Sequence, residues 1–254
     1  MTSFGIAEIL IVLGLVLVSF DVKQISKALR WIRSLRTKFY RMQSDLRYQF
    51  NSLLEEEETK EKETSTQEEV KRWRTWGRTR VAELKEDTKA DASENIVKLI
   101  SDFPIYKKAE YIGAYVSLSD ELNTRALISQ ILKDGKKLLL PYIIEAEMNF
   151  AIIEDLEKDT IKGAFDILEP DHSHRVEPDC LPDLFLIPGR CFDQNGARIG
   201  RGKGYYDKYL EKQPGKRLGI CFDNQIALEP IPQQSHDQKM DYIISDQRII
   251  NLEL

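Results

Sequence analysis

The sequence predicts an α/β domain of three layers (α/β/α) with a largely parallel sheet, preceded by a transmembrane helix and an amphipathic helix. Three observations support this fold class. The chain opens with an apolar run, continues with a basic segment of helical periodicity, and then alternates short apolar runs with intervals of helix length. With 42% hydrophobic and 31% charged residues, the composition excludes a fully disordered chain and a polytopic membrane protein.

The first predicted element is a transmembrane helix over residues 1–20. The stretch from Phe4 to Phe20 is apolar apart from Glu8, and its length is near the short limit for a hydrocarbon layer of about 30 Å. A signal peptide would have Lys or Arg before its apolar run, but here none precedes it. Basic residues follow the run instead. The positive-inside rule then predicts a single-pass protein of the inner (cytoplasmic) membrane, with the N-terminus outside and the C-terminal domain in the cytoplasm.

The second predicted element is a basic amphipathic helix over residues 21–54. This segment has eight Lys or Arg against two Asp, a net charge of +6. Its apolar residues recur every three or four positions and form one stripe along a helix: Ile25, Leu29, Ile32, Leu35, Phe39, Met42, Leu46, Phe50 and Leu53. Such a helix can lie among anionic lipid headgroups, or it can pack on protein like an ordinary amphipathic helix.

Residues 55–69 are predicted to separate this membrane end from the C-terminal domain. They include no apolar residue and have a net charge of −6, so we expect an acidic, solvated linker or a fraying extension of the helix. Residues 70–254 have a net charge of −4, which argues against nucleic acid as a partner. The three cysteines show no CxxC spacing, which excludes a disulfide framework.

Six short apolar runs in the C-terminal domain are predicted as strands. They are 111–116, 137–141, 148–153, 184–188, 217–221 and 241–245. Intervals of helix length follow several of them, notably 121–134 and 204–212. This alternation is typical of a largely parallel sheet with helices on its faces.

A glycine-rich loop between Pro188 and Leu210 concentrates the candidate chemistry. Three glycines, at positions 200, 202 and 204, alternate with Arg201 and Lys203, so backbone amides and cations can face an anion. The spacing fits neither the P-loop nor the dinucleotide-binding motif, and a flexible turn with solvated charges is the alternative. Asp207 can hold Mg²⁺ against phosphates, or simply interact with the dipole of the helix it begins.

From Val70 to Leu254 the chain resembles the 5-formyltetrahydrofolate cyclo-ligase family, also called methenyltetrahydrofolate synthetases. Six landmarks occur in the family's order, and the glycine loop followed by YYD is the most specific of them. The landmarks are YVSLSDELNT (115–124), MNF (148–150), GAFDILEP (163–170), DLFLIPGRCFD (183–193), RIGRGKGYYDKYL (198–210) and SHDQKMDYIIS (235–245).

The resemblance implies an ATP-dependent ligase that forms a carbon–nitrogen bond. Such an enzyme converts 5-formyltetrahydrofolate to 5,10-methenyltetrahydrofolate with Mg²⁺ as cofactor and ATP as co-substrate, and releases ADP and phosphate. The formyl oxygen attacks the γ-phosphorus, and N10 of the same folate then displaces phosphate, so the protein mainly positions two ligands and stabilises charge.

The resemblance also implies roles for individual residues. ATP binding is implied for Lys71, Arg74, Arg198, Ile199, Gly200, Arg201, Gly202, Lys203, Gly204, Tyr205 and Tyr206. Substrate binding is implied for Val116, Glu121, Arg201, Gly202, Lys203, Gly204 and Tyr205, and catalysis for Arg201, Lys203 and Tyr205. The implied magnesium ligands are Asp207 and Asp237.

Two positions depart from the family's pattern. In the helix that precedes the domain, either Lys71 with Arg74 or Arg74 with Arg78 can take the place of the family's Lys and Arg. Arg190 stands where the family usually has an apolar residue, so it either reshapes the wall of the folate pocket or points to solvent.

The first fifty residues resemble the small A/B-type subunits of the twin-arginine translocase. The similarity rests on Phe4, Gly5, Glu8 and Phe20, and on the stretch ISKALRWIRSLRTKF. It implies translocase-like membrane partners. The alternative function is therefore a translocase-like membrane component whose C-terminal domain binds nucleotide or folate without turnover.

Overall fold

The computed structural model describes residues 21–163, 168–171, 173, 176, 178 and 181–252, together with residues 11 and 14. The chain divides into two compact units, Met1–Thr64 and Ser65–Leu254. The transmembrane helix predicted over residues 1–20 lies outside the described part of the chain, apart from residues 11 and 14. Within the described part, no helix is long and apolar enough to cross a membrane.

Helix α2 (Val22–Ala82) includes the predicted basic helix from its second residue onward. The apolar stripe of this helix is exposed in the first unit at every position whose side chain is described: Leu29, Ile32, Leu35, Phe39, Met42, Leu46, Phe50 and Leu53. The acidic segment 55–69 is helical, because Glu and Lys are good helix formers despite the charge repulsion. Of the two expectations for this segment, the helix extension is therefore observed, and the division between the units falls inside it.

The second unit is built on a seven-stranded sheet of order β12-β11-β9-β6-β1-β2-β3. Strands β11, β9, β6, β1 and β2 are parallel, and the two edge strands are antiparallel to their neighbours. The largely parallel sheet is confirmed, and all six predicted strands are present. The strands are β1 (Tyr111–Gly113), β2 (Lys137–Ile144), β3 (Glu147–Ile153), β6 (Leu184–Pro188), β9 (Lys216–Cys221), β11 (Tyr242–Ser245) and β12 (Ile249–Asn251).

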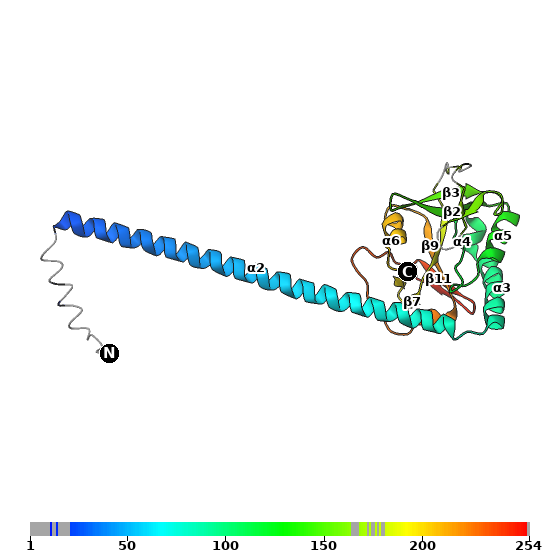
Figure 1. Cartoon of the computed structure of the whole chain (residues 1–254), viewed down its shortest axis with the longest axis horizontal. Helices are drawn as coiled ribbons and strands as arrows, with labels where there is room; N and C mark the ends of the chain where they lie inside the picture. Colours follow the sequence, from blue (N-terminus) through cyan, green and yellow to red (C-terminus); the bar gives the residue numbers. More distant parts are fainter. Residues whose placement is uncertain are drawn as a thin grey trace. The chain divides into compact units, whose positions relative to one another are not determined.

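Helices cover both faces of this sheet, which confirms the predicted three layers. Helices α3 (Glu86–Asp102), α4 (Pro104–Lys108) and α5 (Arg125–Lys133) lie on one face, and α6 (Tyr205–Leu210) lies on the other (Figure 1). Strand β6 shows why both faces must be covered. Leu184 and Leu186 enter the core under α3 and α5, whereas Phe185 and Ile187 enter the core on the α6 side.

A small three-stranded sheet carries the glycine loop. It consists of β7 (Cys191–Asp193), β8 (Arg198–Ile199) and β10 (Ile226–Ala227), in the order β10-β7-β8. Its apolar core packs against three residues at the C-terminal end of α2, namely Val70, Trp73 and Trp76. The 3-10 turn η2 (Asp223–Gln225) precedes β10, and a separate hairpin pairs β4 (Thr160–Lys162) with β5 (Leu168–Pro170).

The order of the parallel strands predicts where a ligand binds. From β1 the chain adds β2 on one side, then returns to β6 on the other side and continues outward through β9 and β11. In open parallel sheets, ligands bind outside the carboxyl ends of the strands where the winding direction reverses. That point lies between β1 and β6, which are followed by the loop 114–124 and by Gly189 and Arg190.

Candidate active site

The loop after β1 has a fixed shape because its ends are tied to each other. The backbone N–H of Ser117 donates to Thr124 Oγ1 at 3.0 Å, and the backbone N–H of Thr124 donates to Ser117 Oγ at 3.1 Å. Within the loop, Glu121 Oε2 accepts the backbone N–H of Leu118 at 3.0 Å. The loop therefore holds Glu121 and its neighbour Asp120 at the carboxyl end of the sheet.

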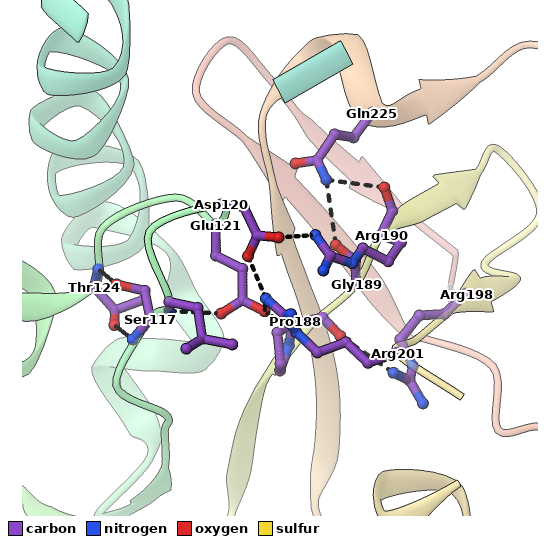
Figure 2. A network of polar contacts seen from close by, with 11 residues as sticks. Ser117, Asp120, Glu121, Thr124, Pro188, Gly189, Arg190, Arg198, Arg201 and Gln225 are labelled. Carbon is purple, nitrogen blue, oxygen red and sulfur yellow. Dashed lines mark hydrogen bonds and ion pairs between the residues drawn. The ribbon is translucent and has the colours of Figure 1, made fainter. Parts of the chain in front are cut away.

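Arg201 of the glycine loop reaches across to these carboxylates. It donates to Glu121 Oε1 through Nε at 3.0 Å and through Nη2 at 2.9 Å, and Nη2 also donates to Asp120 (Figure 2). A second arginine, Arg190, donates to the other oxygen of Asp120. Two residues predicted to bind ligands, Glu121 and Arg201, are thus brought together from positions 80 residues apart.

The electrostatics of this network favour the ionised forms of Asp120 and Arg201. Burial alone would raise the pKa of Asp120, but the hydrogen bonds and charges of Arg190 and Arg201 outweigh it and hold the pKa below the usual range. Burial alone would lower the pKa of Arg201, but Glu121 and Asp120 reverse the effect and raise it. The network is therefore a set of two cations and two anions.

A second, more deeply buried ion pair supports the base of the glycine loop. Arg198 Nη2 donates to both carboxylate oxygens of Asp207 at 2.9 Å, and the two side chains are only 4% and 13% exposed. Arg198 Nη1 donates to the carbonyl of Pro188 at 3.2 Å, and its guanidinium lies 5.7 Å from the centre of the Tyr206 ring. Arg198 thus ties the end of β6 to the start of α6.

The glycine loop adopts a conformation that requires glycine. Gly202 and Gly204 have φ angles of +99° and +68°, in the left-handed region. Arg74 of α2 donates from Nε to the carbonyl of Gly200 at 3.0 Å, and a Cβ at Gly202 would come within 3.1 Å of the Arg74 guanidinium. Lys203 is exposed, and within the described chain it makes no polar contact. The loop therefore presents Lys203 to solvent without a protein partner, while Arg74 of α2 contacts its backbone.

Of the two predicted magnesium ligands, Asp207 contacts the residue that follows Asp237. Asp207 Oδ1 accepts the backbone N–H of Gln238 at 3.2 Å, which places the residue after Asp237 against it. Asp237 Oδ2 accepts the backbone N–H of Gln234 at 2.8 Å. No cluster of three or more acidic, His or Cys side chains suited to a metal ion occurs among the described residues. Any metal here would therefore depend on oxygen atoms from bound ligands or water as well.

The remaining predicted residues lie around this centre at different depths. Tyr206 is close enough for the charge of Glu121 to add to burial in raising the pKa of its hydroxyl, while Tyr205 is partly buried at the start of α6. Ile199 is buried in the core of the small sheet, and Val116 in the core under α5. Lys71 is exposed on α2, so of the alternatives on this helix only Arg74 contacts the loop within the described residues.

Three site residues were not predicted from the sequence in the roles they have here. Asp120 was overlooked beside Glu121, although two adjacent carboxylates after a strand were a visible signal. Arg190 does not point to solvent, because its side chain is 13% exposed and pairs with Asp120, whereas its effect on the wall of the folate pocket stays a prediction. Gln225 is buried and donates to the carbonyls of Gly189 and Arg190 at 3.3 and 2.9 Å, and no sequence pattern marked it.

Comparison with known proteins agrees with this geometry. A fission yeast protein (Schizosaccharomyces pombe) named probable 5-formyltetrahydrofolate cyclo-ligase is 31% identical over 177 residues, which cover 62% of this chain and 85% of the relative. The mouse 5-formyltetrahydrofolate cyclo-ligase is 32% identical over 153 residues, covering 55% of this chain and 74% of the mouse protein.

A solved structure is similar over most of the second unit. The NMR structure of Aquifex aeolicus 5,10-methenyltetrahydrofolate synthetase matches with a TM-score of 0.64 and 27% identity, covering 72% of this chain and 92% of that structure. The family model described as the 5-formyltetrahydrofolate cyclo-ligase family matches residues 40–246. The expectation drawn from the glycine loop and its accompanying motifs is thereby confirmed, and the chain belongs to the 5-formyltetrahydrofolate cyclo-ligase family.

Proposed function

We propose that this chain converts 5-formyltetrahydrofolate and ATP to 5,10-methenyltetrahydrofolate, ADP and phosphate, with Mg²⁺ as cofactor. The observation that carries the proposal is the placement of two kinds of binding group at one switch point of the sheet. A glycine loop suited to phosphate lies on one side and the carboxylate of Glu121 on the other, and Arg201 joins them. The relatives named as cyclo-ligases support the same reaction.

The reaction places few chemical demands on the protein. The formyl oxygen of the folate attacks the γ-phosphorus and ADP leaves, after which N10 attacks the activated formyl carbon and phosphate departs with that oxygen. Lys203, exposed on the loop, neutralises charge that develops on the transferring phosphoryl group, and Arg201 does so between the two ligands. Glu121, held by the backbone of its own loop, orients the folate ring.

The ligands for the nucleotide come from two elements. Arg74 of α2 donates to the carbonyl of Gly200, and in this proposal the backbone N–H groups of the glycine loop bind the phosphates. Tyr205 and Tyr206 begin α6 directly after the loop. In this proposal, Lys71 and Arg74 bind the phosphates from outside the loop, and Tyr205 closes the site over the reacting groups.

The two aspartates fit the chemistry of Mg²⁺. This ion usually takes one or two protein carboxylates and completes its shell with water and phosphate oxygens. Asp207 and Asp237 supply such carboxylates, and each keeps free lone pairs beside its present hydrogen bonds. When bound, Mg²⁺ would neutralise the charge of the phosphates.

A single assay tests the catalytic proposal. The full chain is incubated with ATP, Mg²⁺ and 5-formyltetrahydrofolate, and methenyltetrahydrofolate is followed by its absorbance. Turnover that requires all three components supports the proposal. Calorimetric binding of nucleotide and folate with no product would contradict it, and would favour the alternative of a non-catalytic binding domain.

We further propose that residues 1–54 attach the enzyme to the inner (cytoplasmic) membrane, with the N-terminus outside and the enzyme in the cytoplasm. An exposed apolar stripe on α2, set among basic side chains of net charge +6, supports an anionic lipid surface as the contact of residues 21–54. The resemblance of this end to translocase subunits supports translocase-like membrane partners.

Membrane fractionation tests this attachment. In the proposal, carbonate or high salt leaves the full chain in the membrane fraction, because an apolar span is not held by charge alone. A variant lacking residues 1–20 should bind vesicles that contain anionic lipid and dissociate as salt screens its basic helix. Extraction of the full chain by salt alone would contradict a spanning segment.

A further inference from the structure

Two arginines from different loops converge on a single carboxylate, that of Asp120. Arg190, directly after β6, donates to Oδ2, and Arg201, in the glycine loop, donates to Oδ1. Arg201 in turn holds Glu121 (Figure 2). The four side chains therefore form a row in the order Arg190, Asp120, Arg201 and Glu121, and their formal charges cancel.

The backbone of Arg190 is held by three different elements. Its N–H donates to the carbonyl of Ile199 at 2.7 Å, and its own carbonyl accepts Gln225 Nε2 at 2.9 Å. Helix α2 approaches so closely that a Cβ at Gly77 would come 1.9 Å from the same carbonyl oxygen. Because its Cα is fixed and its side chain is 13% exposed, the guanidinium has little choice of direction, and Asp120 is its only polar partner within the described chain.

Both loops have hydrogen bonds of their own besides the Arg190–Asp120 pair. The loop that carries Asp120 is closed by the hydrogen bonds between Ser117 and Thr124. The segment that carries Arg190 is closed by Gln225. The pair therefore adds little to the loops themselves, and its effect falls on the next residue in the row, Arg201.

We propose that Asp120 and Arg190 are positioning residues for Arg201, an inference that rests on the proposed function. Asp120 holds the guanidinium of Arg201 beside Glu121, and Arg190 compensates the second charge of that carboxylate pair. Without Arg190, one arginine would be shared by two carboxylates, and the row would have a net charge of −1. Arg201 would then be held more tightly by the protein and would be less available to an anionic ligand.

The test is a double-mutant cycle on the full chain. Arg190→Leu, Asp120→Asn and the double variant are compared with the wild type for kcat, for the KM of each substrate and for Tm. Both single changes break the charge-assisted Arg190–Asp120 contact, and Asp120→Asn also weakens the contact of Asp120 with Arg201, so we expect each to lower kcat/KM for 5-formyltetrahydrofolate about tenfold. The double variant should have a kcat/KM no lower than that of the less active single variant. Arg190→Lys keeps the positive charge and should therefore retain most of the kcat/KM that Arg190→Leu loses.

A matched control separates positioning from stability. Arg248→Leu removes an arginine–aspartate pair of similar kind, that of Arg248 with Asp223 (2.8 Å), outside the proposed site. This variant should leave kcat/KM unchanged whatever its Tm, whereas Arg190→Leu should lower kcat/KM even at a temperature well below its Tm, where the protein is fully folded. If Asp120→Asn fails to fold, Arg190→Leu and Arg190→Lys still provide the comparison.

Two outcomes would overturn the proposal. Losses that multiply in the double variant would show that the two residues act independently, and single variants within about twofold of wild type would show that they do not position Arg201. If the wild-type chain itself shows no turnover, the proposed function fails, and the same cycle is measured on the affinities for ATP and for 5-formyltetrahydrofolate. Unchanged affinities in all variants would then refute the positioning role separately.

Discussion

Lys203 differs from the arginines of the site because it is exposed and, within the described chain, has no acceptor in the protein. Its charge is therefore free to meet a ligand at little cost. We expect Lys203→Ala to lower kcat on the order of 10²-fold, the typical cost of removing one preorganised contact to a transition state, with little change in Tm. Lys208→Ala removes an exposed cation five residues further along and should leave kcat unchanged. Equal kcat values for both variants at saturating ATP would exclude Lys203 from the chemistry.

Asp207 is a structural partner as well as a proposed magnesium ligand. Its carboxylate compensates the charge of Arg198, which is only 4% exposed, so Asp207→Asn leaves a buried cation without its counter-charge. Such a change commonly costs about 3 kcal/mol, or roughly 6–12 °C in Tm for a domain of this size. Asp237 has no arginine partner within the described residues, so Asp237→Asn should leave Tm unchanged.

Metal titration completes this comparison. Under the proposed function, both variants need more Mg²⁺ for half-maximal activity, but only Asp207→Asn melts early in thermal unfolding. An unaltered Tm for Asp207→Asn would mean that the Arg198 pair contributes little to the fold. An unaltered Mg²⁺ requirement for both variants would remove the two aspartates from the metal site.

Among the secondary-structure elements, the C-terminal end of α2 contacts both the small sheet and the glycine loop. Gly77 lies where the helix meets the carbonyl of Arg190, and a methyl group there would overlap backbone that cannot swing aside. Alanine favours a helix over glycine by about 1 kcal/mol, but the overlap should outweigh this gain. Gly77→Ala should therefore lower Tm and also activity, since Arg74 is on the same helix.

The exposed residue Thr79 offers a control on the same helix. Thr79→Ala improves helix propensity without a clash, so it should raise or preserve Tm and leave kcat/KM unchanged. Urea unfolding and steady-state kinetics measure both variants. A Gly77→Ala protein as stable and active as wild type would show that α2 can move away from the small sheet at no cost.

The sequence was a good guide to elements whose pattern is local. All six predicted strands exist, because each is a short apolar run with buried side chains, and LFLIP at 184–188 is buried on both faces of the sheet. Helices α3 and α4 were not predicted, since 86–102 is rich in charge and buries only four side chains. The strands of the small sheet were missed because two or three residues show no periodicity.

In the candidate site, too, contiguous residues were predicted and contacts between distant residues were not. The glycine loop was predicted because its residues are contiguous and its spacing is distinctive. The pairing of Arg198 with Asp207, and of Arg190 with Asp120, was not predicted, because a sequence shows which charges exist and not which of them meet. Only the strand order brings the loops after β1 and β6 to one edge.

At the scale of the whole molecule, the titration of buried groups predicts a loss of stability in alkali. Burial raises the pKa of Cys191 from 9.0 to about 12, and that of Tyr209 from 10.0 to about 12. As pH rises above 9.0, these groups ionise in the unfolded chain first, which favours unfolding. The stabilisation is therefore complete below that pH and is lost as the pH approaches 12.

Urea unfolding at about pH 8 and at about pH 10.5 measures this effect. We expect a lower free energy of unfolding at the higher pH. Cys191→Ala lacks one of the ionising groups, so its stability should fall less steeply between the two conditions, whatever its starting value. Equal slopes for the variant and wild type would mean that the Cys191 thiol ionises as easily in the folded protein as in the unfolded chain.

The contact between Arg74 and Gly200 also has a consequence for the order of events during synthesis. The two residues are 126 positions apart, so at 5–20 residues per second a ribosome needs roughly 6–25 s to add the second after the first. Throughout that interval Trp73 and Trp76 have no small sheet to pack against. A newly made chain therefore carries an uncovered aromatic face on α2 until the small sheet, which ends with β10 (Ile226–Ala227), has been translated.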